Sequence, residues 1–148
     1  MNYETDFDAL TNKYRSLTHS ELLNIKPRWA FKDNIDKISN HNLDPYFNSY
    51  EIVSFKTKNI VTRVNFLELD PKVLFTRDDA SDYRVAKILD DWQNMKFIDP
   101  PTLSISLEGQ LTFSDGRHRT IVAYHLKELE MPIAFHKSLS SLIRARLI

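Results

Sequence analysis

Apolar side chains recur every three or four positions in several stretches of the chain, which is the spacing of amphipathic helices. In the N-terminal third this spacing joins Phe7, Leu10, Tyr14 and Leu17. A second short helix is predicted from Thr18, because residues 18–21 have the Thr-x-x-Glu form of a capping box. Further helices are predicted over residues 80–94, 117–129 and 139–147. The helix over residues 117–129 is expected to bury Ile121, Val122, Leu126 and Leu129.

Alternating apolar and polar residues predict strands between these helices. Residues 51–55 and 60–66 are expected to form two strands joined by a turn at residues 56–59. A hairpin is expected from residues 103–107 and 110–113, with Glu108 and Gly109 in its turn, and a last strand from residues 131–135. Strands and helices alternate without the regular period of a doubly wound sheet, so the sequence predicts an α+β fold.

The chain has 148 residues, which suffices for one compact unit with a hydrophobic core. Near residue 50 the pattern changes from helical and irregular to alternating strands and helices. We therefore expect residues 1–50 to form a helical extension packed on a domain of residues 51–148. The aromatic residues of the extension are expected to be packing anchors rather than a base-stacking platform; they are Trp29, Phe31, Tyr46, Phe47 and Tyr50.

Composition and charge exclude several classes of protein. Twenty Lys and Arg balance twenty Asp and Glu, so no net positive field holds DNA, and DNA binding is not expected. The absence of cysteine excludes disulfides, thiolate nucleophiles and sulfur-ligated metal sites. No apolar run approaches the roughly 18 residues of a membrane span, and the start, with Glu4 and Asp6, is acidic where a signal peptide would be basic. We expect a cytoplasmic protein without a membrane segment.

The candidate chemistry is concentrated in residues 113–120, Phe-Ser-Asp-Gly-Arg-His-Arg-Thr. This segment follows a predicted strand and opens a predicted helix. Arg117, His118 and Arg119 would then lie in the first helical turn, where each cation costs about 0.3–1 kcal/mol. A bound anion would remove this cost, and the free N–H groups beside Gly116 would help to hold it. The motif therefore indicates a phosphate site.

The segment from Trp92 to Phe135 resembles the core of the ParB/sulfiredoxin-like superfamily. The matching features are Asp99-Pro100-Pro101, the turn Asp115-Gly116-Arg117-His118-Arg119, Ala123, and Met131-Pro132-Ile133. Residues 69–77 resemble the segment before the family's first helix, so the resemblance covers about residues 60–135. It implies a small mixed sheet flanked by helices and a nucleotide phosphate site at the turn. The family's functions include CTP-dependent DNA partitioning, ATP-dependent sulfinic acid reduction, serine phosphorylation and nuclease activity.

Two departures from the family narrow these functions. Sulfiredoxin chemistry needs a cysteine at the position where this chain has Arg117. Chromosome-partitioning proteins continue into a helix-turn-helix DNA reader, whereas this chain ends thirteen residues after Phe135. We therefore expect a stand-alone phosphate-binding domain.

The expected binding roles fall on five residues. Arg117 and Arg119 would donate forked hydrogen bonds to phosphate oxygens. Gly116 and Thr120 would complete the binding turn, and Arg77 is a further phosphate ligand by resemblance alone. The implied ligand is ATP or CTP.

The expected catalytic roles fall on His118 as a general acid or base and on Asp115, which would hold Mg²⁺ or orient the nucleophile. A second interpretation of the same motif involves no ligand. In it Asp115 caps the helix, Gly116 relieves the turn, and the cations lie in solvent.

Two functions remain open at this point. One is an enzyme that carries out Mg²⁺-dependent hydrolysis of a nucleoside triphosphate, phosphoryl transfer or phosphodiester cleavage at residues 115–119. The other is a non-catalytic accessory or inhibitor protein of plasmid or phage type, which acts by contact with a protein partner through its N-terminal extension.

Overall fold

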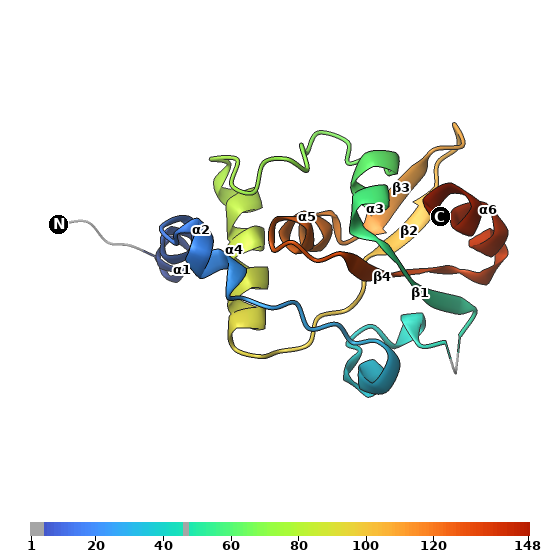
Figure 1. The fold of residues 1–148 in the computed structure, drawn as a ribbon, viewed down its shortest axis with the longest axis horizontal. Coiled ribbons are helices and arrows are strands. Elements are labelled where there is room, and N and C mark those ends of the chain that lie inside the picture. The colour runs from blue at the N-terminus through green and yellow to red at the C-terminus, as the bar shows by residue number, and fades with distance from the viewer. Residues whose placement is uncertain (1–4, 46–47) are drawn as a thin grey trace.

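The protein is described here by a computed structural model of residues 5–45 and 48–148 (Figure 1). Its helices are α1 (Asp6–Arg15), α2 (His19–Leu23), α3 (Thr57–Arg63), α4 (Asp79–Gln93), α5 (Arg117–His125) and α6 (Ser140–Leu147). Short 3-10 helices are η1 (Lys32–Lys37), η2 (His41–Leu43) and η3 (Lys137–Leu139), and the strands are β1 (Tyr50–Lys56), β2 (Thr102–Ile105), β3 (Leu111–Asp115) and β4 (Glu130–His136). Within the described ranges, no helix combines the length and apolarity needed to cross a membrane.

The four strands form one mixed sheet in the order β1-β4-β2-β3. β1 runs antiparallel to β4, with Val53 opposite Ile133, and β2 runs antiparallel to β3. β2 and β4 are parallel and meet at Thr102 and Ala134. The expected α+β fold with a small mixed sheet flanked by helices is confirmed.

The sheet separates two apolar clusters, because successive side chains of a strand point to opposite faces. Met131, Ile133 and Phe135 of β4 pack into the main core, which also takes buried residues from α3, α4, α5 and α6. Ala134 points the other way, into a smaller cluster formed with residues that precede β1; these are Ala30, Ile38 and Leu43. Residues 30–43 therefore cover the second face of the sheet.

The expected strand over residues 60–66 is wrong, because residues 57–63 form α3. Ile60 and Val64 lie four positions apart and are 0% and 6% exposed, which suits one face of a helix. The Thr57 N–H donates to the carbonyl of Leu129 at 3.0 Å and ties the start of α3 to the end of the α5–β4 connection. Packing of α3 against α5 and α6 overrides the strand preference of its β-branched residues.

Helix α5 is shorter than expected and ends at His125 rather than at residue 129. Lys127 adopts a positive φ of 64°, and the Glu128 N–H returns to the Ala123 carbonyl, so the chain leaves the helix there. The expected burial of Ile121, Val122 and Leu126 is confirmed, whereas Leu129 lies beyond the helix and is 84% exposed.

The caps of two helices and the hairpin agree with the sequence pattern, although β2 ends at Ile105 and not at the expected residue 107. Helix α4 is capped by Asp78, whose carboxylate accepts from the Ser81 N–H at 2.9 Å. The capping box of Thr18 and Glu21 is present at the start of α2. The hairpin β2–β3 turns at Gly109, which has a φ of 79°.

Helix α1 lies beside α4, as Figure 1 shows. Tyr14 of α1 is buried in the main core, and its hydroxyl donates to Asp90 of α4 at 2.8 Å. Burial, together with this hydrogen bond, raises the pKa of Tyr14. The extension is thus tied to the same core as the rest of the chain.

Two of the five aromatic residues expected as packing anchors, Trp29 and Tyr50, pack against the apolar clusters. Trp29 packs edge-on against Trp92 at 5.1 Å, Tyr50 packs on the smaller cluster, and Phe31 is half-buried. Tyr46 and Phe47 lie outside the described residues, as does Glu4 in the acidic start.

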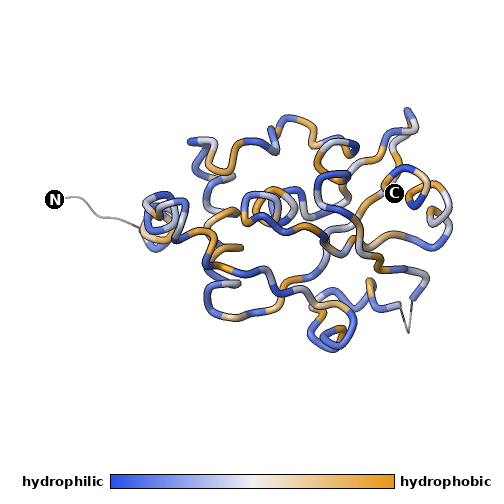
Figure 2. The backbone as a smooth tube through the Cα atoms, in the orientation of Figure 1, coloured by the Kyte–Doolittle hydropathy of each residue, from blue (hydrophilic) through white to orange (hydrophobic). Residues whose placement is uncertain are grey.

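The connection between α3 and α4 carries several apolar segments, which Figure 2 shows along it. Leu69, Leu74 and Phe75 of this connection are partly buried against the main core. Its end is anchored to α4 by Asp82, whose carboxylate accepts from the N–H groups of Thr76 at 2.7 Å and Arg77 at 3.1 Å. The connection therefore has a defined position beside α4 and α5.

Candidate functional site

Two adjoining hollows lie between α4 and the N-terminal end of α5. The larger, with a volume of about 570 Å³, is also lined by the connection between α3 and α4, including Leu69 and Val73. The smaller, of about 410 Å³, lies over the turn at residues 115–119. Arg84, Arg117 and His118 line both hollows and form the wall between them. We refer to the two hollows together as the α4–α5 cleft.

The turn at the start of α5 is built around Gly116. Its φ is 95°, and a Cβ at this position would lie 2.7 Å from the Cα and Cβ of Pro101. Both the left-handed backbone and the close approach of Pro101 therefore require glycine. No side chain caps the N-terminus of α5. Asp115 therefore does not cap the helix. The second interpretation of the motif, which involves no ligand, is wrong about this cap.

The two arginines of the motif already have partners inside the protein. Arg117 donates to the carboxylate of Glu68 at 3.0 Å and to the Phe66 carbonyl at 3.2 Å. Arg119 donates to Asp115 at 2.9 Å and contacts the carbonyls of Asp99 and Pro100. An external anion is therefore not required to balance these two arginines, which weakens the electrostatic reason for expecting one.

Their carboxylate partners are nevertheless exposed and exchangeable. The side chain of Glu68 is 71% exposed and that of Asp115 is 69% exposed, whereas the two arginines are only about one quarter exposed. Exposed ion pairs contribute little, typically about 0–1 kcal/mol, because water and salt screen them. A phosphate in the cleft could take over donors of Arg117 at a small cost.

His118 lies half-buried at the centre of the cleft, and its Nε2 is 2.9 Å from the Oγ of Ser81. Burial, followed by the positive charges of Arg84 and Arg117, lowers the pKa of His118 below its ordinary value. Glu68 and Asp82 act in the opposite direction with smaller effect. The imidazole is therefore neutral near pH 7, and the neutral form can accept a proton.

The positions of Thr120 and Asp115 differ from those that their expected roles require. Thr120 is fully buried, and its hydroxyl donates to the Gly116 carbonyl at 3.0 Å, so it braces the turn and does not line the cleft. Asp115 lines the smaller hollow at its exposed rim. In the part of the chain that the structure describes, no three His, Cys, Asp or Glu side chains come together to hold a metal ion.

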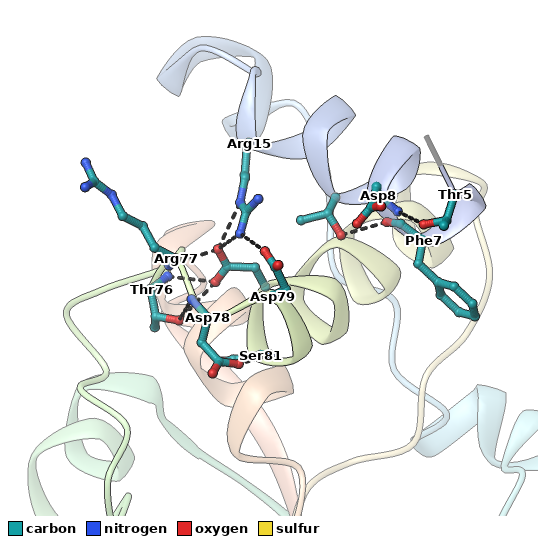
Figure 3. Close-up of polar contacts among 11 residues, drawn as sticks. Thr5, Phe7, Asp8, Arg15, Thr76, Arg77, Asp78, Asp79 and Ser81 are labelled. Carbon is teal, nitrogen blue, oxygen red and sulfur yellow. Dashed lines mark hydrogen bonds and ion pairs between the residues drawn. The ribbon is translucent and has the colours of Figure 1, made fainter. Parts of the chain in front are cut away.

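Arg77, expected as a phosphate ligand, does not line either hollow. Figure 3 shows its guanidinium group directed away from Ser81, while its backbone N–H binds Asp82. Arg84, which was not expected from the sequence, takes the position on the cleft wall. Among the described residues Arg84 has no ion-pair partner. The sequence shows that Arg84 lies five residues after Asp79, where α4 begins. It does not show that this part of α4 lies against α5.

The chain matches no model of a known protein family, no curated protein and no solved structure. The structure itself defines an α+β fold with a cleft whose two hollows are both lined by Arg84, Arg117 and His118.

Proposed function

We propose that the α4–α5 cleft binds a nucleotide, with the phosphates against Arg84, Arg117 and the N-terminal end of α5. The observation that carries this proposal is the placement of Arg84, without an ion-pair partner in the described residues, beside an uncapped helix N-terminus. Free N–H groups and the helix dipole favour an anion at that position. The resemblance of residues 113–120 to the phosphate turn of ParB/sulfiredoxin-like domains supports the same ligand.

The shape of the cleft fits a nucleotide rather than free phosphate. The larger hollow has the volume of a small-molecule site, for which about 300–1,000 Å³ is usual. Leu69, Val73 and Ala80 give it an apolar wall, against which a base and ribose would lie. Mg²⁺ would enter with the nucleotide phosphates as its main ligands, and Asp70 or Asp78 of the larger hollow or Asp115 of the smaller one would add a carboxylate ligand.

The test is a thermal-shift titration of the purified chain with ATP, CTP, GTP and UTP, each with and without Mg²⁺. A nucleotide at about 100 times its dissociation constant stabilises the fold by about 2.7 kcal/mol and raises the melting temperature. Arg84→Gln is expected to raise the dissociation constant about 10- to 100-fold, because it removes a charge-assisted hydrogen bond to the phosphate.

Arg77→Gln is the matched control, because it removes an equally charged, exposed side chain that lies just before α4 and does not line the cleft. It should leave the dissociation constant unchanged. Equal losses for both variants would show general attraction by positive charge and not a site. If none of the four nucleotides changes the melting temperature, the proposal fails, and contact with a protein partner through the N-terminal helices becomes the better candidate.

A further inference from the structure

We propose that Ser81 is the nucleophile of the α4–α5 cleft and accepts the terminal phosphoryl group of a bound nucleoside triphosphate, with His118 receiving the hydroxyl proton. This inference rests on the proposed nucleotide site and adds the reaction that the site performs. Ser81 lies in the first turn of α4, and both residues line the larger hollow.

The Ser81–His118 pair is produced by the fold and not by local sequence. The two residues are 37 positions apart, and their side chains meet at 2.9 Å across the contact between α4 and α5. The N–H group of Ser81 is held by the Asp78 carboxylate, which fixes the backbone of that turn. When His118 carries its proton on Nδ1, the Ser81 hydroxyl donates to Nε2, which is the arrangement of an activated serine.

A second serine–histidine pair in the protein shows what a purely local contact looks like. Ser138 and His136 are two positions apart, both are exposed, and the histidine Nδ1 also accepts the Ser138 N–H at 3.1 Å. That pair caps η3 and lines none of the hollows described above. The Ser81–His118 pair differs in that both of its residues line the larger hollow, which Arg84 and Arg117 also line.

Two arginines, Arg84 and Arg117, line the cavity that Ser81 also lines, and fixed cations suit phosphoryl transfer better than acyl transfer. The N-terminal end of α5 adds partial positive charge, while the carboxylates of Glu68, Asp70 and Asp78 line the same cavity and Glu68 pairs with Arg117. A transferring phosphoryl group spreads negative charge over three oxygens, and several fixed cations stabilise that charge. The single oxyanion of an acyl intermediate needs fewer donors.

In the proposed step, the Ser81 Oγ attacks the γ-phosphorus of the nucleoside triphosphate. A bond forms between Oγ and phosphorus while the bond from phosphorus to the bridging β–γ oxygen breaks, and its electron pair leaves on the nucleoside diphosphate. The hydroxyl proton passes to Nε2 of His118, and the product is phosphoserine at position 81. His118 is suited to this role because its lowered pKa keeps it neutral near pH 7.

The experiment incubates the full chain with Mg²⁺ and γ-labelled ATP or CTP, stops the reaction with acid at early and late times, and locates the label by mass spectrometry of peptides. We expect label on Ser81, none in Ser81→Ala, and at least about 100-fold slower labelling in His118→Gln. Ser138→Ala is the matched control and should label as the unchanged chain does. Ser81→Ala keeps the N–H that binds Asp78, so its melting temperature should stay close to that of the unchanged chain.

Label on another residue, or undiminished label in Ser81→Ala or His118→Gln, would overturn the inference. Nucleotide binding without label at any time would overturn it while the proposed nucleotide site stands. Absence of both binding and label would remove the proposed function as well. Modification of Ser81 by a fluorophosphonate but not by nucleotides would assign acyl transfer and refute the phosphoryl step.

Discussion

Replacing Arg15 by methionine removes the positive partner of a buried carboxylate. Asp82 is 0% exposed, and Arg15 donates to it through Nε at 2.9 Å and Nη2 at 2.6 Å. Burial by itself would raise the pKa of Asp82, but the hydrogen bonds from Thr76, Arg15 and Arg77 outweigh it and hold the pKa below its ordinary value. The same carboxylate anchors the connection that forms one wall of the cleft.

The magnitude follows from this geometry. Breaking a buried ion pair by removing one partner costs about 3–5 kcal/mol, and we expect about 3 kcal/mol because Asp82 keeps its bonds to Thr76 and Arg77. For a chain of this length that loss lowers the melting temperature by about 6–12 °C. Urea unfolding monitored by circular dichroism measures the free energy of unfolding, and thermal unfolding measures the shift.

Arg144→Met is the matched control, because Arg144 binds Glu51 at 2.7 Å but its side chain is 44% exposed. Its loss should cost about 0–1 kcal/mol. If Arg15→Met costs no more than Arg144→Met, the reasoning about the buried pair is refuted.

A pH titration adds a second readout of the same pair. Because the folded pKa of Asp82 is depressed, its stabilisation is present above the ordinary aspartate pKa of about 3.9 and is lost as the pH falls through the folded value. Without Arg15 the folded pKa rises, so stability should begin to fall at a higher pH. If the stability of Arg15→Met falls over the same acidic pH range as that of the unchanged chain, the assigned role of the Arg15–Asp82 pair is contradicted.

Two further predictions concern the start of α5. In NMR titrations, His118 should ionise below its ordinary pKa, so its stabilisation is present above about pH 6.5 and lost as the pH falls through the lowered value. Arg84→Gln should raise the pKa of His118 part of the way to its ordinary value, because it removes one of the positive charges that lower it. The pKa of His125 should stay unchanged, since burial and not Arg84 is the main cause of its lowering. Equal pKa shifts of the two histidines would contradict this prediction. Gly116→Ala should lower the free energy of unfolding by about 2–5 kcal/mol, because it combines backbone strain with overlap on a proline ring. Gly109→Ala, with a φ of 79° and no atom within 4 Å of the added carbon, should cost only about 1–2 kcal/mol, and similar losses in urea unfolding would argue against the close packing at Gly116.

The sequence by itself determined the features that depend on local spacing. Apolar residues three or four apart in α4, the alternating hairpin with Gly109 in its turn, and the capping box at Thr18 all predicted the observed elements. The strand–turn–helix context of residues 113–120 also located one side of the cleft. These predictions hold because helix period, strand alternation and turn residues act between near neighbours in the chain.

Only the tertiary structure decided the features that depend on distant contacts. Residues 57–63 became a helix because burial of Ile60 against neighbouring helices outweighs a local strand preference. Glu68 meets Arg117 across 49 positions, and Ser81 meets His118 across 37, so no spacing in the sequence could pair them. The packing of α4 on α5 brings these groups and Arg84 to one cleft, and that packing is set by the apolar core beneath them.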